Sequence, residues 1–362
     1  MKILQVIPAF VKGGAERVVV EISNNLEERN HEVTCLVLFE VEPKLNANKL
    51  LSPIHKLNIL EKLRPNGINL FLTLKWIIKK RKFLESFDVI HCHLTFGLLF
   101  GAITRILFTI FRHNKTVFVF TWHFVGVHVS SRIKFIHWLC IPFFDFIVFM
   151  AQTRQIRKFL NSRSKSKFRI IANGIKPIQR KSESTFPKNA TAGTLSRLVP
   201  ERRPKEIMEV FICLINLKAN TRIRVGGTGP ELSFLEKLVF DHQIQERVTF
   251  HGLVTDSESF LSEIDFYVTL SVGENLGISG IEAISMGIPT YGLEISGDEN
   301  GKPSYFFSSK KPLDIATQIA FHMESPRELS KYIKQQYEVF LSEYTAEVMT
   351  DRYLSLYDEK FI

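Results

Sequence analysis

Apolar residues in the first half of the chain come in short runs that alternate with stretches of helical periodicity. Residues 3–7 form an apolar run typical of a buried parallel strand, and Gly13-Gly14 separates it from an amphipathic stretch over residues 15–26. The alternation continues, with further strands predicted at 32–38, 88–93, 116–120, 144–150 and 170–172 and a helix at 96–111. The pattern therefore predicts repeated strand–helix–strand units.

The second half repeats this alternation after a polar interruption. Residues 179–190 are charged and lack periodicity, which is typical of a linker between domains. Beyond them, the pattern predicts strands at 192–195, 222–225, 248–250 and 265–270 and helices at 205–217, 231–241 and 257–264. Charged helices that contain tyrosines are expected between Pro326 and Tyr357.

Such alternation is typical of an α/β fold with parallel sheets covered by helices on both faces. We expect an N-terminal Rossmann-like domain over residues 1–178 and a second one over residues 191–340, facing each other across a cleft. The last segment, 341–362, is expected to contain a helix that packs back toward the N-terminal domain. Ligands of such folds bind at the carboxyl ends of the strands.

Two glutamates eight residues apart form the most specific chemical signal. Glu274 lies in a glycine-rich turn directly after an apolar strand, and Glu282 lies in the helix that begins near Gly277. A helix N-terminus presents unpaired N–H groups and a positive dipole end, which suit a phosphate. Glu274 is then placed for hydroxyl groups and Glu282 for a ribose. The alternative is an ordinary strand–turn–helix with solvated carboxylates.

Arg197 and Arg202 follow the first strand of the second domain. Guanidinium groups bind diphosphate oxygens bidentately and offset the charge that develops on a departing diphosphate. The next strand leads into the glycine turn 226–230, which includes Gly229 but lacks the Gly-Lys-Ser/Thr of a P-loop. A basic surface loop and a common glycine turn are the alternatives when each element is taken alone. The order and spacing of all three elements predict a diphosphate site.

Charge is distributed unevenly along the chain. Residues 1–180 contain 28 Lys/Arg and 11 Asp/Glu, whereas residues 181–362 contain 19 and 26, which gives formal charges of +17 and −7. The stretch 70–84 reads as an amphipathic helix with three lysines on one face, Lys75, Lys79 and Lys82, and an apolar stripe of Leu70, Leu74, Ile77 and Leu84. Such a helix binds anionic membranes. The alternative is a core helix with solvated lysines. No nucleic-acid-binding module is recognisable.

Three further features limit the chemistry. The four cysteines are scattered without a CxxC pair, which favours a reduced, cytosolic protein. His91 and His93 alternate along a strand, but no acidic or cysteine cluster at ligand spacing accompanies them, so we expect a structural or substrate-contacting role and no metal site. The apolar run 94–111 contains Arg105 near its middle, which favours a buried or membrane-contacting helix over a membrane span.

Taken in order, these motifs resemble the GT-B-fold retaining glycosyltransferases, in particular glycosyltransferase family four. The resemblance extends over nearly the whole chain. The matching elements are 13–17, 30–33, 88–93, 121–123, 173–175, Arg197 with its following cation, 227–231, 248–252 and Glu274-x7-Glu282 with its Gly287-Ile-Pro289 tail. Three positions depart from the family pattern: Ser196 replaces a glycine, Arg202 replaces a lysine, and 290–297 replaces a paired-glycine turn.

The resemblance implies a role for each matching residue. The catalytic group comprises Arg197 and Arg202 on the diphosphate, Glu274 on the donor sugar and His123 near the transferred sugar. The donor-binding group comprises Gly13, Gly14, Gly229, Leu253, Asn275, Gly277, Ile278 and Glu282.

The activity implied is a retaining glycosyltransferase of hexosyltransferase type. It is expected to use a nucleoside-diphosphate sugar and a glycan or lipid-linked acceptor in cell-surface polysaccharide biosynthesis, with no cofactor and no required metal. Its expected location is cytoplasmic, peripheral on the inner face of the plasma membrane, and no nucleic-acid partner is expected. The alternatives are a nucleotide-sugar epimerase of the same fold and a non-catalytic glycosyltransferase-like partner subunit.

Overall fold

The computed structural model describes two compact units. It describes residues 1–10, 13–39, 50, 54–56, 70–123, 131–151, 167–178, 190–218, 220–271, 276–294 and 305–359, with the backbone alone at 54–56, 70 and 271. Unit 1 comprises Met1–Met150, Ile156–Gly174 and Ala346–Ile362, and unit 2 comprises Ala151–Gln155 and Ile175–Thr345. The end of the chain therefore belongs to the unit in which the chain begins.

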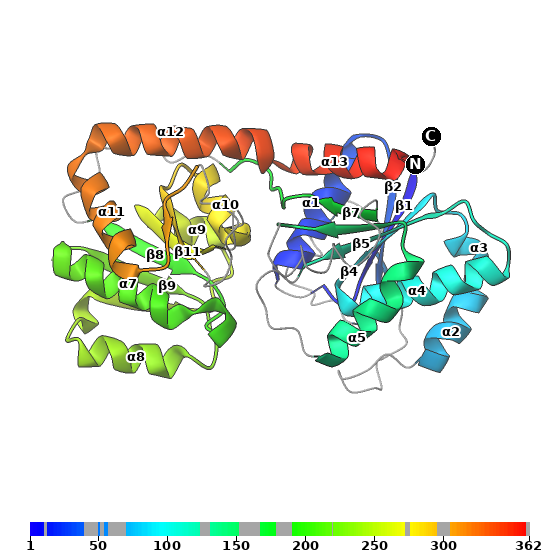
Figure 1. Ribbon diagram of the computed structural model, residues 1–362, viewed down its shortest axis with the longest axis horizontal. Coiled ribbons are helices and arrows are strands. Elements are labelled where there is room, and N and C mark those ends of the chain that lie inside the picture. The colour runs from blue at the N-terminus through cyan, green and yellow to red at the C-terminus, as the bar shows by residue number, and fades with distance from the viewer. Residues whose placement is uncertain are drawn as a thin grey trace. The chain divides into compact units, whose positions relative to one another are not determined.

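Unit 1 is built on a seven-stranded parallel sheet (Figure 1). Its strands are β1 (Lys2–Ile7), β2 (Glu32–Val37), β3 (Ile54–Lys56), β4 (Val89–His93), β5 (Val117–Trp122), β6 (Phe146–Phe149) and β7 (Phe168–Ile170). They pair in the order β3-β2-β1-β4-β5-β6-β7, so that the chain reverses direction across the sheet between β1 and β4. Most of their residues are buried, as expected for a parallel sheet covered on both faces.

Helices cover both faces of this sheet. On one face, α2 (Leu70–Lys79), α3 (Arg81–Leu84), α4 (Leu94–Ile110) and α5 (Ser131–Cys140) share a core of phenylalanines and aliphatic residues with the strands. On the other face, α1 (Gly14–Glu28) packs on β1 and β2. The last helix of the chain, α13 (Ala346–Asp358), packs against α1, and Arg29 at the end of α1 pairs with Asp351.

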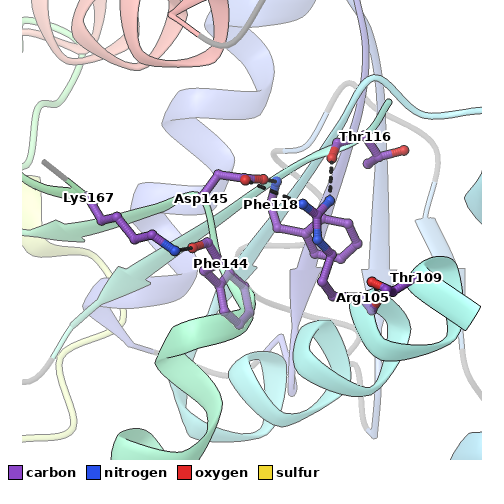
Figure 2. Close-up of polar contacts among 7 residues, drawn as sticks. All are labelled: Arg105, Thr109, Thr116, Phe118, Phe144, Asp145 and Lys167. Carbon is purple, nitrogen blue, oxygen red and sulfur yellow. Dashed lines mark hydrogen bonds and ion pairs between the residues drawn. The ribbon is translucent and has the colours of Figure 1, made fainter. Parts of the chain in front are cut away.

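Arg105 is accommodated in the apolar helix α4 by partners on the sheet (Figure 2). Its guanidinium donates to the Thr116 carbonyl oxygen at 3.0 Å, lies 3.5 Å from the Asp145 carboxylate and stacks 5.1 Å from the Phe118 ring centroid. The same carboxylate accepts a hydrogen bond from the Phe118 N–H at 2.9 Å.

Within the described residues, no helix is both long and apolar enough to traverse a lipid bilayer.

Unit 2 has a six-stranded parallel sheet. Its strands are β8 (Thr191–Leu195), β9 (Arg222–Gly226), β10 (Val248–Gly252), β11 (Phe266–Ser271), β12 (Thr290–Glu294) and β13 (Ser308–Ser309), paired in the order β10-β9-β8-β11-β12-β13. The helices α7 (Pro204–Leu217), α8 (Leu232–Asp241) and α11 (Pro312–Glu324) contribute to one core, and α9 (Ser257–Ser262) and α10 (Gly277–Ser285) to a second one. Helix α12 (Pro326–Glu343) packs on α10 and α11. Both units thus have the doubly wound α/β architecture that the sequence predicts.

The structure corrects several local predictions. Residues 70–84 do not form one helix but α2 and α3, which meet at Lys80. Of the predicted apolar stripe, Ile77 and Leu84 are buried, whereas Leu74 is exposed and the Leu70 side chain lies outside the described set. The segment after Pro289, expected as a variant turn, is strand β12.

Candidate functional site

The carboxyl edge of the unit 2 sheet brings together the predicted site elements of the second half. Strand β8 lies between β9 and β11, and the crossover that follows β10 returns the chain to the other side of β8. This is a topological switch point, the place where ligands bind in open α/β sheets. The segment that contains Arg197 follows β8, the glycine turn follows β9, and the segment that leads to α10 follows β11.

Two of the three arginines after β8 are available to an anion. Arg203 binds the Glu206 carboxylate at 2.8 Å and the Glu294 carbonyl oxygen at 3.3 Å. In contrast, no carboxylate of the described residues forms an ion pair with Arg197, which is exposed, or with Arg202. Burial lowers the pKa of Arg202, and the nearby charge of Arg197 lowers it further. An anionic ligand here would relieve both effects, because it adds negative charge beside the two guanidinium groups.

The glycine turn is required by the packing of two loops. The Leu198 N–H donates to the Thr228 carbonyl at 2.9 Å, and the Gly227 N–H donates to the Gly252 carbonyl at 2.7 Å. Gly227 has a φ of +131°, and a Cβ there would overlap the Ser196 carbonyl oxygen. A Cβ on Gly229 would likewise overlap the Leu198 carbonyl oxygen. These glycines therefore hold the segment that contains Arg197 against the end of β9.

Helix α10 begins beside the end of β8. Gly277 opens it with a φ of +71°. The Ser279 hydroxyl donates to the Leu195 carbonyl at 2.9 Å, and the Tyr267 hydroxyl donates to the same carbonyl at 3.1 Å. The N–H groups near Gly277 and Ile278 thus lie at the start of a helix that is hydrogen-bonded to the end of β8. Arg197 follows that same strand. Tyr267 and Ser279 were not anticipated, because a tyrosine in an apolar strand and a serine in a helix resemble ordinary core and surface positions.

Glu282 and Leu253 occupy contrasting surroundings. Glu282 is 2% exposed, and its Oε1 accepts a hydrogen bond from the Ser257 hydroxyl at 2.8 Å. Leu253, directly after the end of β10, is 63% exposed. A buried carboxylate held by a hydroxyl is a positioned acceptor and not the solvated group of the alternative interpretation.

Glu274 and Asn275 lie outside the described residues, as does most of the predicted linker (179–189).

The carboxyl edge of the unit 1 sheet carries a chain of hydrogen-bonded histidines. Gln5 Oε1 lies 2.8 Å from His93 Nε2, and His93 Nδ1 lies 2.9 Å from His123 Nε2. An amide oxygen only accepts, so His93 donates from Nε2 and its Nδ1 accepts from the His123 Nε2–H. His123 is thereby left with an unprotonated Nδ1, a hydrogen-bond acceptor suited to a hydroxyl group.

A second part of this network anchors the C-terminal helix. His91 lies between Tyr357 of α13 and Thr121 of β5, at 2.8 Å and 2.7 Å, and Thr121 lies 2.9 Å from the Tyr353 hydroxyl. Burial lowers the pKa of His123 to about 3 and lowers the pKa values of His91 and His93 well below the ordinary value. The imidazoles are therefore neutral at physiological pH. The sequence identified the histidines but not their partners, because nothing local links β4 to residues 353 and 357.

The remaining predicted positions are Gly13 and Gly14 at the start of α1. Gly13 is extended (φ −158°), and the Glu16 carboxylate folds back toward it. Neither glycine has a positive φ, so their backbone conformations are open to other residues. No group of three or more His, Cys, Asp or Glu side chains in the described part of the chain is arranged to hold a metal ion.

Two family models together match most of the chain. Residues 12–178 match the family "Glycosyltransferase Family 4", and residues 175–339 match "Glycosyl transferases group 1". The O-antigen biosynthesis glycosyltransferase WclY of Escherichia coli is 25% identical over 303 residues, which cover 78% of this chain and 82% of that protein. The alpha-monoglucosyldiacylglycerol synthase of Acholeplasma laidlawii is 20% identical, with 94% and 92% covered. The structure of HepE from Anabaena in complex with UDP-glucose matches with a TM-score of 0.78 at 17% identity, covering 99% of this chain and all of that one (100%).

Proposed function

The chain is a GT-B glycosyltransferase of glycosyltransferase family four, and from this premise we propose that it transfers a sugar, with retention, from a nucleoside-diphosphate sugar to a hydroxyl group of a glycan or lipid-linked acceptor. The observation that carries the proposal is the switch point of unit 2. There, two arginines without carboxylate partners among the described residues follow β8, and the start of α10 is bonded to the end of the same strand. Both features favour a diphosphate.

In the proposed reaction, the bond between the anomeric carbon and the diphosphate oxygen breaks as the acceptor oxygen attacks from the same face. The acceptor proton passes to the departing diphosphate. Arg197 and Arg202 stabilise the negative charge that develops there, since fixed charges aimed at developing charge lower the barrier. Glu274 is assigned to hydroxyls of the donor sugar, Glu282 to the ribose, and the Nδ1 acceptor of His123 to a hydroxyl of the transferred sugar.

The donor-binding set otherwise follows the family resemblance. Gly277, Ile278 and Asn275 contribute backbone groups near the phosphates, Leu253 lies beside the base, and Gly13 and Gly14 approach the phosphates or acceptor. We assign Gly229 an indirect role, since its lack of a side chain keeps the Arg197 segment in place.

The names of the relatives support the acceptor class. WclY is an O-antigen biosynthesis enzyme, and the Acholeplasma relative makes an alpha-linked glycolipid. On the strength of these two names, we propose a role in cell-surface polysaccharide or glycolipid biosynthesis. We further propose that the enzyme works on the cytoplasmic side of the plasma membrane, where nucleotide sugars and lipid-linked acceptors meet, and that it needs no metal ion.

The donor is tested by thermal unfolding with a panel of nucleoside-diphosphate sugars in EDTA. A ligand at 100 times its dissociation constant stabilises the folded state by about 2.7 kcal/mol, so one member of the panel should raise the melting temperature clearly above the rest. No stabilisation by any member would contradict the proposal, and stabilisation only after a divalent cation is added would contradict the metal-free part of it.

Retention is tested on the product made with the donor so identified. Proton NMR of the new linkage, recorded before any further reaction, gives its anomeric configuration. The proposal expects the configuration of the donor, and an inverted linkage would overturn it. A control without acceptor should leave the donor sugar unchanged, whereas an epimerase would interconvert it.

A further inference from the structure

The outward faces of α2 and α5 have an unusual composition. In α5, the buried side contains His137 and Cys140, while the opposite side exposes Phe135 (62%), Trp138 (50%) and Leu139 (53%). Residues on the outer face of a helix in a soluble protein are normally polar, so a helix that is apolar on both faces has a second apolar partner.

Helix α2 repeats this arrangement. Thr73 and Ile77 face the core, whereas Phe71 is 72% exposed and Ile78 is 49% exposed. Both α2 and α5 contact α4, and all three helices share the core on one face of the unit 1 sheet (Figure 1). Their outward sides therefore lie on the same side of the sheet, and we call their combined exposed residues the basic aromatic face. Its members are Phe71, Leu74, Lys75, Ile78, Lys79, Arg132, Lys134, Phe135, Trp138 and Leu139.

The charges on this surface are all of one sign. Neither the described stretch 70–84 nor α5 contains an aspartate or a glutamate. Lys75, Lys79, Arg132 and Lys134 are all exposed among the apolar side chains. The Phe135 and Trp138 rings stack on each other, with centroids 6.1 Å apart. Basic residues, a tryptophan and apolar side chains without acids are the composition of surfaces that enter the headgroup layer of anionic lipids.

We propose that the basic aromatic face docks on an anionic lipid bilayer, with Phe71, Phe135 and Trp138 entering the interface and the lysines and arginines contacting lipid phosphates. This docking rests on the proposed function at the plasma membrane and specifies which surface contacts the lipid. It includes α5, which the charge pattern of the sequence did not indicate. It does not require transfer activity, since docking on lipid is measured without donor or acceptor.

The experiment is flotation of the full chain with vesicles of phosphatidylcholine and phosphatidylglycerol, with phosphatidylcholine vesicles in parallel and no donor or acceptor present. The chain should float with the anionic vesicles only. The double variant Phe135→Ser/Trp138→Ser and the double variant Lys75→Glu/Lys79→Glu should each weaken partitioning at least tenfold, which corresponds to about 1.4 kcal/mol. The matched control is Phe240→Ser on α8 of unit 2, an equally exposed phenylalanine (67%) outside this surface, which should float like the wild type.

Insertion is distinguished from adsorption by tryptophan fluorescence. Brominated lipid should quench the emission of the wild type, and the variant Trp138→Phe should show clearly less quenching. Unchanged flotation of either double variant, or flotation equal on neutral vesicles, would overturn the proposal. Absence of flotation together with an association of chains that Phe135→Ser abolishes would assign the surface to a second copy instead. Because no substrate is present, each of these failures leaves the proposed transfer reaction standing.

Discussion

The two units share one architecture but carry opposite chemistry at the carboxyl edges of their sheets. The unit 1 edge holds neutral imidazoles that bond to one another, to Gln5 and to Tyr357 of α13. The unit 2 edge holds two arginines without carboxylate partners among the described residues, together with a glycine turn and a helix start. The fold supplies the edge, and a few side chains decide whether that edge suits hydroxyl groups or phosphates.

This contrast runs against the overall charge of the two halves. The first half has a formal charge of +17, yet the strand edge of unit 1 is neutral, whereas the second half has −7 and its edge is cationic. Four basic residues of the first half, Lys75, Lys79, Arg132 and Lys134, lie instead on the outward faces of α2 and α5. Net charge therefore describes what a domain is attracted to over a distance, and local pairing describes what its site binds.

The largest expected effect concerns the neutral histidines of unit 1. Because the pKa of His123 falls from 6.5 to about 3 on folding, the unfolded chain binds the extra proton, and stability is lost as pH falls below 6.5. Each such histidine lowers the free energy of unfolding by about 1.2 kcal/mol between pH 7 and 5.5, so His91, His93 and His123 together account for about 4 kcal/mol.

This loss is measurable by urea unfolding across that pH range. Between pH 7 and 5.5, the free energy of unfolding of the variant His91→Gln should fall by about 1.2 kcal/mol less than that of the wild type. A free energy of unfolding that stays level between pH 7 and 5.5 would mean that the imidazoles are not held neutral.

The next effect concerns the arginines of unit 2. Removing Arg197 and Arg202 together by substitution with alanine should lower kcat/KM on the order of 10²–10³-fold, as expected for groups that stabilise developing charge. Arg222→Ala, an exposed arginine at the opposite, amino end of β9, is the matched control and should retain activity within about threefold. Equal losses in both variants would show that general charge, and not the switch point, supports turnover.

Substitution of one glycine in each unit by alanine compares the two units in stability. Gly227→Ala places a methyl group against the Ser196 carbonyl at a φ of +131° and should lower the free energy of unfolding by about 2 kcal/mol or more. Gly13→Ala in unit 1 meets the Glu16 side chain and no backbone atom, at an extended φ, so the cost should be smaller, about 1 kcal/mol or less. Chemical denaturation measures the free energy of unfolding of both variants. Similar losses in the two variants would refute the steric argument.

The smallest effect concerns the tie between α13 and the strands. Tyr357→Phe removes the hydroxyl that bonds to His91 and should lower the free energy of unfolding by about 1 kcal/mol, with kcat/KM little changed. Thermal unfolding and a steady-state assay of the same preparation measure both quantities. A large loss of activity without a loss of stability would assign α13 a direct part in the reaction.

The sequence predicted most of the fold because long apolar runs and helical periodicity are local signals. It placed β1, β2, β4 and the strands β8–β11 to within a residue or two. It did not predict β12, where Gly292 and flanking polar residues interrupt the apolar pattern, although Tyr291 is fully buried. It did not predict α5 either, because a helix that is apolar on both faces has no clear periodicity.

At the site, the sequence indicated residue types but not their pairing. The family resemblance selects Arg202 over its neighbour Arg203, and only the fold shows that Glu206 engages Arg203. The tautomer of His123 depends on Gln5, more than a hundred residues away, so no local pattern contains it. Such contacts arise from the parallel pairing of strands and from the return of α13 to unit 1.

The most direct test of the central claim is a calorimetric titration of the full chain with a panel of nucleoside diphosphates. Our account predicts that at least one binds, that Arg197→Ala weakens it at least tenfold, or about 1.4 kcal/mol, and that Arg222→Ala does not weaken it. Binding of none of them, or undiminished binding by Arg197→Ala, would contradict the assignment of the unit 2 switch point as the diphosphate site.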